Sequence, residues 1–219
     1  MKRYLLFILA LMMVSIGDSL CFKANIGVSP YEALALTFNY MSHIKVGTLT
    51  LLVNACMILF QITLSKQFKI KYVLQFLMSL FFGLVVNAIV YQVLGGITLQ
   101  YYQSLIIEII GLCFSASGCG LLVALNVCVF PCEGFALTFS ETFKVDFQKA
   151  RQVMDIILVI TCISLSLSFQ CGFALREGTI MAACIFSPIM GFVQRSAIKT
   201  TPKRRGFHCG CKPVLLARV

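Results

Sequence analysis

The chain has 219 residues, of which 59% are apolar and only 12% are charged, and it contains no tryptophan. A soluble domain carries about twice that charged fraction, so the composition excludes an ordinary soluble fold and indicates an integral membrane protein. The apolar runs are continuous rather than alternating, which favours helices over a membrane barrel. The net charge of +10 needs no nucleic acid to explain it, because basic residues beside a membrane face anionic lipid.

Six stretches are long enough to cross about 30 Å of hydrocarbon at about 1.5 Å per residue. In chain order they are predicted at 4–22, 47–65, 73–93, 105–125, 151–170 and 177–195. Two shorter segments, 30–42 and 131–143, follow the first and the fourth span. Each is too short to span the bilayer, so each is predicted as an interfacial or re-entrant helix.

The first span follows Lys2 and Arg3, as the apolar core of a signal peptide would. No small-x-small cleavage site follows it, and bulky Leu20 precedes Cys21, where a lipoprotein signal has a small residue. The segment also matches the fourth span, which cannot be a signal. We therefore predict an uncleaved first span.

The segment Asn25 to Phe38 recurs as Asn126 to Phe139, with eight of the fourteen positions identical. The flanking residues agree with this offset, since Gly17 corresponds to Gly118, Leu20 to Leu121 and Asn54 to Asp155. A repeat of this length indicates two duplicated halves, about 1–96 and 100–198, within a single membrane domain, 1–198.

Three spans per half is an odd number, so the second copy enters the membrane from the opposite side. The prediction is therefore two inverted three-helix repeats, the pattern of many transporters. If the short segments crossed the membrane, the halves would instead be parallel. The charges favour the inverted arrangement, since fifteen Lys and Arg residues fall on one side and three on the other, which predicts that both termini are cytoplasmic.

Residues 199–219 are basic and predicted to form a disordered cytoplasmic tail on anionic lipid. His208, Cys209 and Cys211 are too few ligands to close a metal site, so neither a metal nor another cofactor is predicted. The remaining cysteines are mostly within spans, where thiols behave as small hydrophobes.

Each short segment begins like a helix. Ser29, Pro30 and Glu32 form a capping box, with serine at the N-cap and glutamate three residues later. The second copy keeps Pro131 and Glu133 but has Phe130 at the cap position. The two glutamates either only cap their helices or, with Asn25 and Asn126, form a polar site at the pseudo-two-fold axis.

These motifs give the chain a resemblance to a known family. In four features the chain resembles the YczE/YyaS/YitT group of bacterial integral membrane proteins. They are the segment Lys23-Ala-Asn-Ile-Gly-Val-Ser-Pro30, its copy around Pro131, the pair Asn54 and Asp155, and the Glu177-Gly178-Thr179 turn. The resemblance covers residues 1 to about 197. It implies a polytopic protein of the bacterial cytoplasmic membrane and carries over no catalytic residue. Cys128 and Phe130 depart from the pattern.

Ionisable groups inside spans are costly and often functional. Asp18 is the strongest candidate, although a boundary pair with Lys23 is the alternative. Asp155 either serves the solute or pairs with Arg151 four residues before it, and Glu108 is expected at the headgroup boundary. Asn87 and several small residues are expected to mediate helix packing, namely Gly83, Ser115, Ser117, Gly118 and Gly120.

No Walker loop, His-Glu-x-x-His or Gly-x-Ser-x-Gly motif occurs, so no enzyme activity is predicted. The leading hypothesis is a small-solute permease or efflux-type transporter of unknown substrate, with these residues lining a central path: Asp18, Asn25, Glu32, Asn126, Glu133 and Asp155. One rival is a non-transporting accessory or regulatory protein that binds a membrane partner, and a homo-oligomer is also open. The other is a substrate-capture subunit for an external ATPase.

Overall fold

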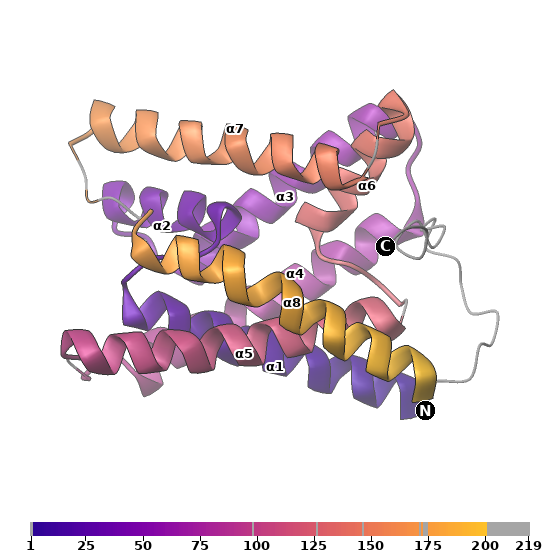
Figure 1. Ribbon diagram of the computed structural model, residues 1–219. Coiled ribbons are helices and arrows are strands. Elements are labelled where there is room, and N and C mark those ends of the chain that lie inside the picture. Colours follow the sequence, from indigo (N-terminus) through magenta and orange to yellow (C-terminus); the bar gives the residue numbers. More distant parts are fainter. Residues whose placement is uncertain are drawn as a thin grey trace.

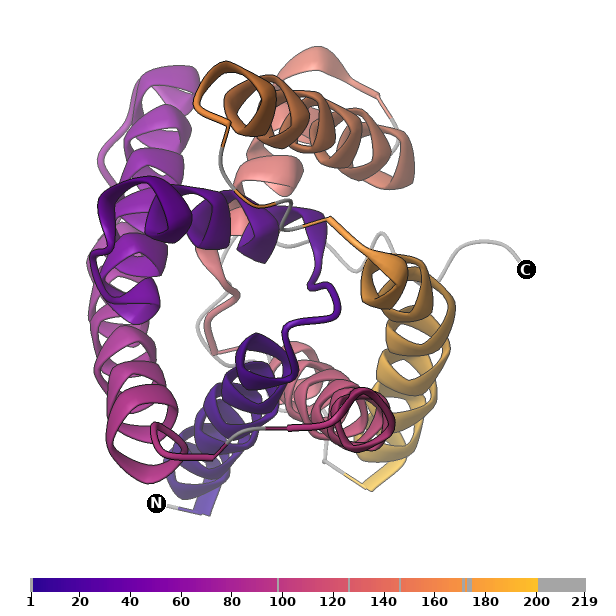
Figure 2. The ribbon, with the colours of Figure 1, turned by 90° about the vertical axis from the view of Figure 1, so that its left-hand side faces the viewer.

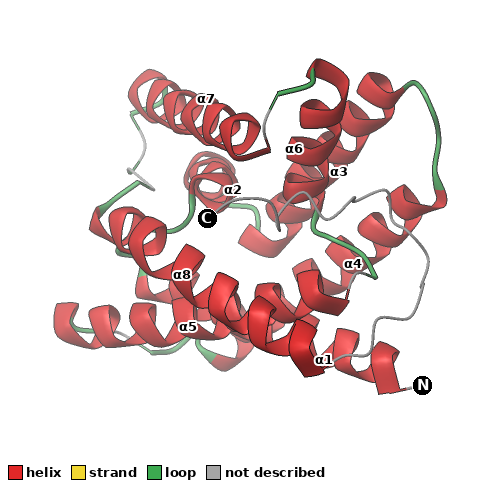
Figure 3. Ribbon diagram, turned by 45° about the vertical axis from the view of Figure 1, so that its right-hand side comes forward, coloured by secondary structure: helices red, strands yellow, loops and turns green. Residues whose placement is uncertain are grey.

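The computed structural model describes residues 2–97, 99–125, 127–145, 147–170, 172 and 175–200. All regular elements in this part are helical, which confirms the predicted all-α class (Figures 1 and 3). In chain order they are α1 (Lys2–Ala24), α2 (Pro30–Ser42), α3 (Val46–Ser65), α4 (Ile70–Asn87) with a π-helical extension η1 (Ala88–Val93), α5 (Tyr101–Leu125), α6 (Pro131–Phe143), α7 (Phe147–Ser168) and α8 (Glu177–Thr200). Asn126 and the predicted tail beyond Thr200 lie outside the described residues.

Within the described residues, five helices are long and apolar enough to cross a membrane: Tyr4–Ala24, Val46–Ser65, Ile70–Val93, Tyr101–Leu125 and Lys149–Ser168. They coincide with the first five predicted spans. The sixth predicted span, 177–195, is helical and forms most of α8, which carries Pro188 in its interior. The chain is therefore a multi-pass integral membrane protein.

The two short helices have nearly the same backbone. Each begins at a proline and has 13 residues, as predicted, and the residue before each proline has φ −58° and ψ 152°. Each also ends on a left-handed residue, His43 (φ 56°) in the first half and Lys144 (φ 53°) in the second. The predicted capping box is present in α2, whereas the cap position of α6 has no side-chain hydrogen bond.

α1 and α5 lie side by side along one edge of the molecule (Figures 1 and 2). Gly17 lies so close to α5 that a Cβ atom would be 2.5 Å from the Ser115 backbone nitrogen. Farther along, Gly118 meets the backbone of Ala10 and Val14 in the same way. Residue numbers rise along α1 as they fall along α5, so the two helices are antiparallel.

α4 flanks this pair beside α1, α8 flanks it beside α5, and the remaining helices lie on one side of it (Figure 2). The short helix of each half packs against a long helix of the other half, α2 against α7 and α6 against α3. α4 packs against α3, with Gly47 on Gly83, and Asn87 accepts a hydrogen bond from the Gly47 N–H at 2.9 Å. This confirms the packing role predicted for Gly83 and Asn87. α8 packs against α5, and Figure 2 shows it apart from α7.

Large apolar side chains cover the outer faces of several long helices. Leu59 and Phe60 of α3, Leu84 of α4, and Ile156 and Ile160 of α7 are all more than half exposed. In water such a surface would be an interaction patch, but on helices of spanning length it faces lipid.

Candidate functional site

The first turns of the two short helices lie close together. Tyr31 and Leu34 of α2 pack against the apolar cluster that contains Cys132 and Ala136 of α6. Each first turn carries a glutamate at its third position, Glu32 in α2 and Glu133 in α6, and the two carboxylates interact electrostatically. Two helix N-termini, the positive ends of the two helix dipoles, therefore meet in one region of the protein.

Asp18 of α1 joins this region. Its carboxyl group lies beside the carboxyl of Glu32 and beside the hydroxyl of Ser115 on α5. Asp18 and Glu32 are each only 8% exposed. The neighbouring Gly17 explains the geometry, because its missing side chain lets α5 approach and brings Ser115 beside Asp18.

Glu32 has a second set of partners. Its Oε2 atom accepts hydrogen bonds from the Ser29 hydroxyl at 2.8 Å and from the Ser29 N–H at 3.2 Å. Glu32 therefore caps α2, one of the two interpretations left open by the sequence, and it also contacts Asp18. Burial raises the pKa of the Glu32 carboxyl above its ordinary value, and the hydrogen bonds to Ser29 and Asp18 act in the opposite direction.

Glu108 is a site residue whose burial between helices the sequence did not indicate. Its side chain has no exposed surface, because α1 covers this face of α5. Neither carboxylate oxygen has a hydrogen-bond partner among the described residues. The Cys21 thiol, a weak donor, lies beside it, and Glu108 interacts electrostatically with Asp18 and Glu32.

The basic residue nearest this region in the second half is Arg151 of α7. It forms both ion pairs found among the described residues, with Glu133 at 3.0 Å and with Asp155 at 3.2 Å. The predicted pairing of Arg151 with Asp155 is thus confirmed, and Glu133 is an unpredicted third member. No corresponding ion pair to Asp18 is present in the described part of the chain, so the alternative pairing of Asp18 with Lys23 is not found.

The equivalent positions Asn54 and Asp155 have related roles. The Asn54 Oδ1 atom accepts a hydrogen bond from the Tyr31 hydroxyl of α2 at 2.5 Å. Asp155 holds the arginine that binds Glu133 of α6. In each half, the residue at this position, Asn54 of α3 or Asp155 of α7, therefore holds the first turn of the short helix, α2 or α6.

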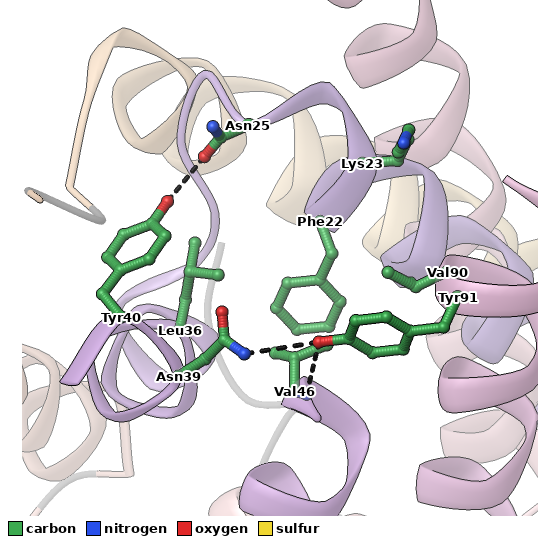
Figure 4. A pocket seen from close by; sticks show the side chains of 9 residues that line it. All are labelled: Phe22, Lys23, Asn25, Leu36, Asn39, Tyr40, Val46, Val90 and Tyr91. Atoms are coloured by element: carbon green, nitrogen blue, oxygen red, sulfur yellow. Dashed lines mark hydrogen bonds between the residues drawn. The ribbon is translucent and has the colours of Figure 1, made fainter. Parts of the chain in front are cut away.

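Asn25 has its hydrogen-bond partners outside the carboxyl cluster. It has a left-handed backbone (φ 54°), its carbonyl accepts a hydrogen bond from Arg176 at 3.0 Å, and its side chain accepts one from the Tyr40 hydroxyl at 2.6 Å. It lines an open pocket of about 220 Å³ (Figure 4). The other lining residues are Phe22, Lys23, Leu36, Asn39, Tyr40, Val46, Val90 and Tyr91.

The two sequence motifs that carry the family resemblance contact each other. The Gly178 N–H donates to the Ile26 carbonyl at 2.9 Å, and a Cβ atom on Gly27 would lie 2.6 Å from the Thr179 nitrogen. Gly27 has φ 138°, a conformation that side chains rarely allow. In the second half, Gln75 donates to the Val129 carbonyl at 3.2 Å. Side chains or backbone from another helix thus hold both connections that precede the short helices.

Fold and site together define a multi-pass helical membrane protein with a buried carboxyl cluster between two half-length helices. Among the described residues, no group of three His, Cys, Asp or Glu side chains is arranged to hold a metal ion. The family of unknown function DUF6198 matches residues 1–195, and the chain belongs to that family. No curated protein and no solved structure matches it. The similarity to the YczE/YyaS/YitT group remains a resemblance between short motifs.

Proposed function

We propose that this protein is a small-solute permease or efflux-type transporter of the bacterial cytoplasmic membrane, and that it has no enzymatic activity. The observation that carries the proposal is the meeting of two half-length helix N-termini beside the buried carboxyl group of Asp18. Transporters use such interrupted helices to place polar groups at mid-membrane, and buried acids there are costly unless they serve a function.

The proposed architecture is two inverted repeats, supported by the contacts between α1 and α5. Gly17 touches the backbone of Gly111 and Ser115, and Gly118 touches that of Ala10 and Val14. A shift of 101 residues converts Gly17 into Gly118, Ala10 into Gly111 and Val14 into Ser115, so the two sets of contacts are equivalent. Two antiparallel helices related by a two-fold axis between them have this contact pattern.

The proposed topology has six spans, with α8 as the sixth and both termini in the cytoplasm. In Figure 1 the α3–α4 and α6–α7 connections lie at the same end of the molecule as the N-terminus. These connections and the adjoining helix starts carry most basic residues outside the termini: Lys66, Lys69, Lys71, Lys144, Lys149 and Arg151. The positive-inside rule then assigns that end to the cytoplasm, where the basic tail contacts anionic lipid.

The proposed path runs past the predicted residues Asp18, Glu32, Glu133 and Asp155, to which the structure leads us to add Glu108. Asn25 belongs to the rim of this path, where the open pocket lies. Asn126 is the counterpart of Asn25 in the repeat and keeps that role in the proposal.

The test is flux into liposomes that contain the purified protein, measured across a panel of small metabolites. A transporter shows saturable flux of at least one compound, loses it in Asp18→Asn, and keeps it in Glu141→Gln, a change at an exposed carboxylate of α6. Deletion of residues 201–219 leaves the flux unchanged. No saturable flux from correctly inserted protein contradicts the proposal.

The same variants separate the rival functions. An accessory protein that regulates a partner tolerates Asp18→Asn and Asp155→Asn but fails when the tail or a loop is removed. A capture subunit binds its solute in detergent yet moves it only when a separate ATPase is present. Either result excludes transport by this chain alone.

A further inference from the structure

We propose that Asp18, Glu32 and Glu108 form a buried proton-binding site, with one proton shared between the carboxyl groups of Asp18 and Glu32. The proton would be the coupling ion of the transporter, and only that last step rests on the proposed function. The site itself is argued from the hydrogen bonds, the burial and the surrounding charges.

The contact between Asp18 and Glu32 requires a proton. An ionised carboxylate has acceptor oxygens only, so two ionised carboxylates cannot hydrogen-bond to each other. These two groups lie side by side and are each only 8% exposed. Two carboxyl groups that share such a site cannot both be ionised, and one retains its proton.

The other hydrogen bonds leave room for this proton. Both donors of Ser29 go to the Oε2 atom of Glu32, so Oε1 is available to Asp18. The hydroxyl of Ser115 lies beside the carboxyl group of Asp18. Each carboxyl group thus has one serine beside it, and the remaining contact lies between the two acids.

Glu108 supplies an independent observation. Its side chain is fully buried, and apart from the adjacent Cys21 thiol, a weak donor, its carboxylate oxygens have no hydrogen-bond partner among the described residues. An ionised group left in that state costs several kcal/mol, whereas a protonated carboxyl is neutral. Glu108 interacts electrostatically with Asp18 and Glu32, so it belongs to the same acidic region.

Among the described residues, no ion pair supplies a positive charge that could replace the proton. The titratable groups around the site are two thiols, a phenol and an acid from four helices: Cys21 of α1, Tyr31 of α2, Cys119 of α5 and Glu133 of α6. The nearby base, Arg151 of α7, is held by Glu133 and Asp155. A metal ion is disfavoured, since the described residues offer no set of three ligands.

The test is infrared spectroscopy of the full chain in lipid, which detects the carbonyl stretch of protonated carboxylic acids. We expect the wild-type protein to show this band near neutral pH, to shift it in D₂O, and to lose it only in alkali. Absence of the band near neutral pH overturns the proposal without any variant.

Variants then assign the band. Asp18→Asn and Glu32→Gln should each remove the component of the shared proton, and Glu108→Gln should remove a second component. The control Glu141→Gln, at an exposed acid, should leave the spectrum unchanged. A band that persists at full strength in all three variants of the site contradicts the assignment. Because no solute is needed, this result is independent of the flux experiment.

Discussion

Gly17 and Gly118 set the distance between α1 and α5, and through it the position of Asp18. Each glycine faces backbone atoms of the other helix, not the end of a flexible side chain that could move aside. Small residues at such crossings let membrane helices approach closely, because packing rather than hydrophobicity drives their association in lipid.

Gly17→Ala should therefore destabilise the protein. The new Cβ atom would lie 2.5 Å from the Ser115 nitrogen and 2.6 Å from the Gly111 carbonyl oxygen, so the helices must separate. We expect a loss of about 1–3 kcal/mol, typical of overpacking, seen as a lower thermal unfolding temperature in detergent.

The matched control is Gly191→Ala in α8, where an added Cβ atom meets nothing within 4 Å. Alanine favours a helix over glycine by up to about 1 kcal/mol, so this variant should be as stable as the wild type or slightly more stable. Equal unfolding temperatures for the two variants would contradict the role assigned to Gly17.

At this scale the sequence predicted local contacts and missed distant ones. The capping box and the pairing of Arg151 with Asp155 follow from spacings of three and four residues within one helix. The contacts of Asp18 with Glu32 and of Arg151 with Glu133 join different helices, so no spacing rule reveals them. The burial of Glu108 likewise depends on how α1 lies on α5.

The two short helices have the same length and nearly the same end geometry, but different chemistry at the cap. α2 uses the hydroxyl of Ser29, whereas α6 has Phe130 at the equivalent position. The Phe130 ring packs edge to face on Phe82 of α4, with 5.6 Å between the ring centroids. The second copy thus has an aromatic contact in place of the cap.

Ser29→Ala should weaken the start of α2 alone. It removes the hydroxyl that bonds both Glu32 and the first turn of the helix, a change that costs about 1 kcal/mol. Hydrogen–deuterium exchange should become faster in the first turn of α2 and stay unchanged in α6. Ser42→Ala, at the exposed end of the same helix, is the control. Equal acceleration in both short helices would show that the cap acts globally.

The helices themselves were largely predictable, because long apolar runs and proline starts are local signals. Both short helices were predicted to the residue. Most of the long ones extend a few residues beyond the predicted apolar runs, because helical hydrogen bonding continues into polar and aromatic ends. Tyr101 and Gln103 at the start of α5 are examples. α7 begins earlier than predicted but ends at Ser168, two residues before the predicted end.

At the scale of the whole molecule, the halves interlock. Each short helix packs on a long helix of its own half and on one of the other half, and α1 packs against α5. The site is therefore built from both halves of the chain. The symmetry is imperfect, because α4 lies along α3 whereas α8 stays apart from α7 (Figure 2).

The central claim is the inversion of the halves, and His43 and Lys144 test it most directly. They end α2 and α6 at equivalent positions, with φ 56° and 53°. With the native cysteines replaced, His43→Cys and Lys144→Cys are each labelled in intact cells by a membrane-impermeant maleimide. Inverted repeats predict that His43→Cys reacts from outside and Lys144→Cys reacts only after the membrane is opened. Equal labelling of both from one side would mean parallel halves and would contradict the account.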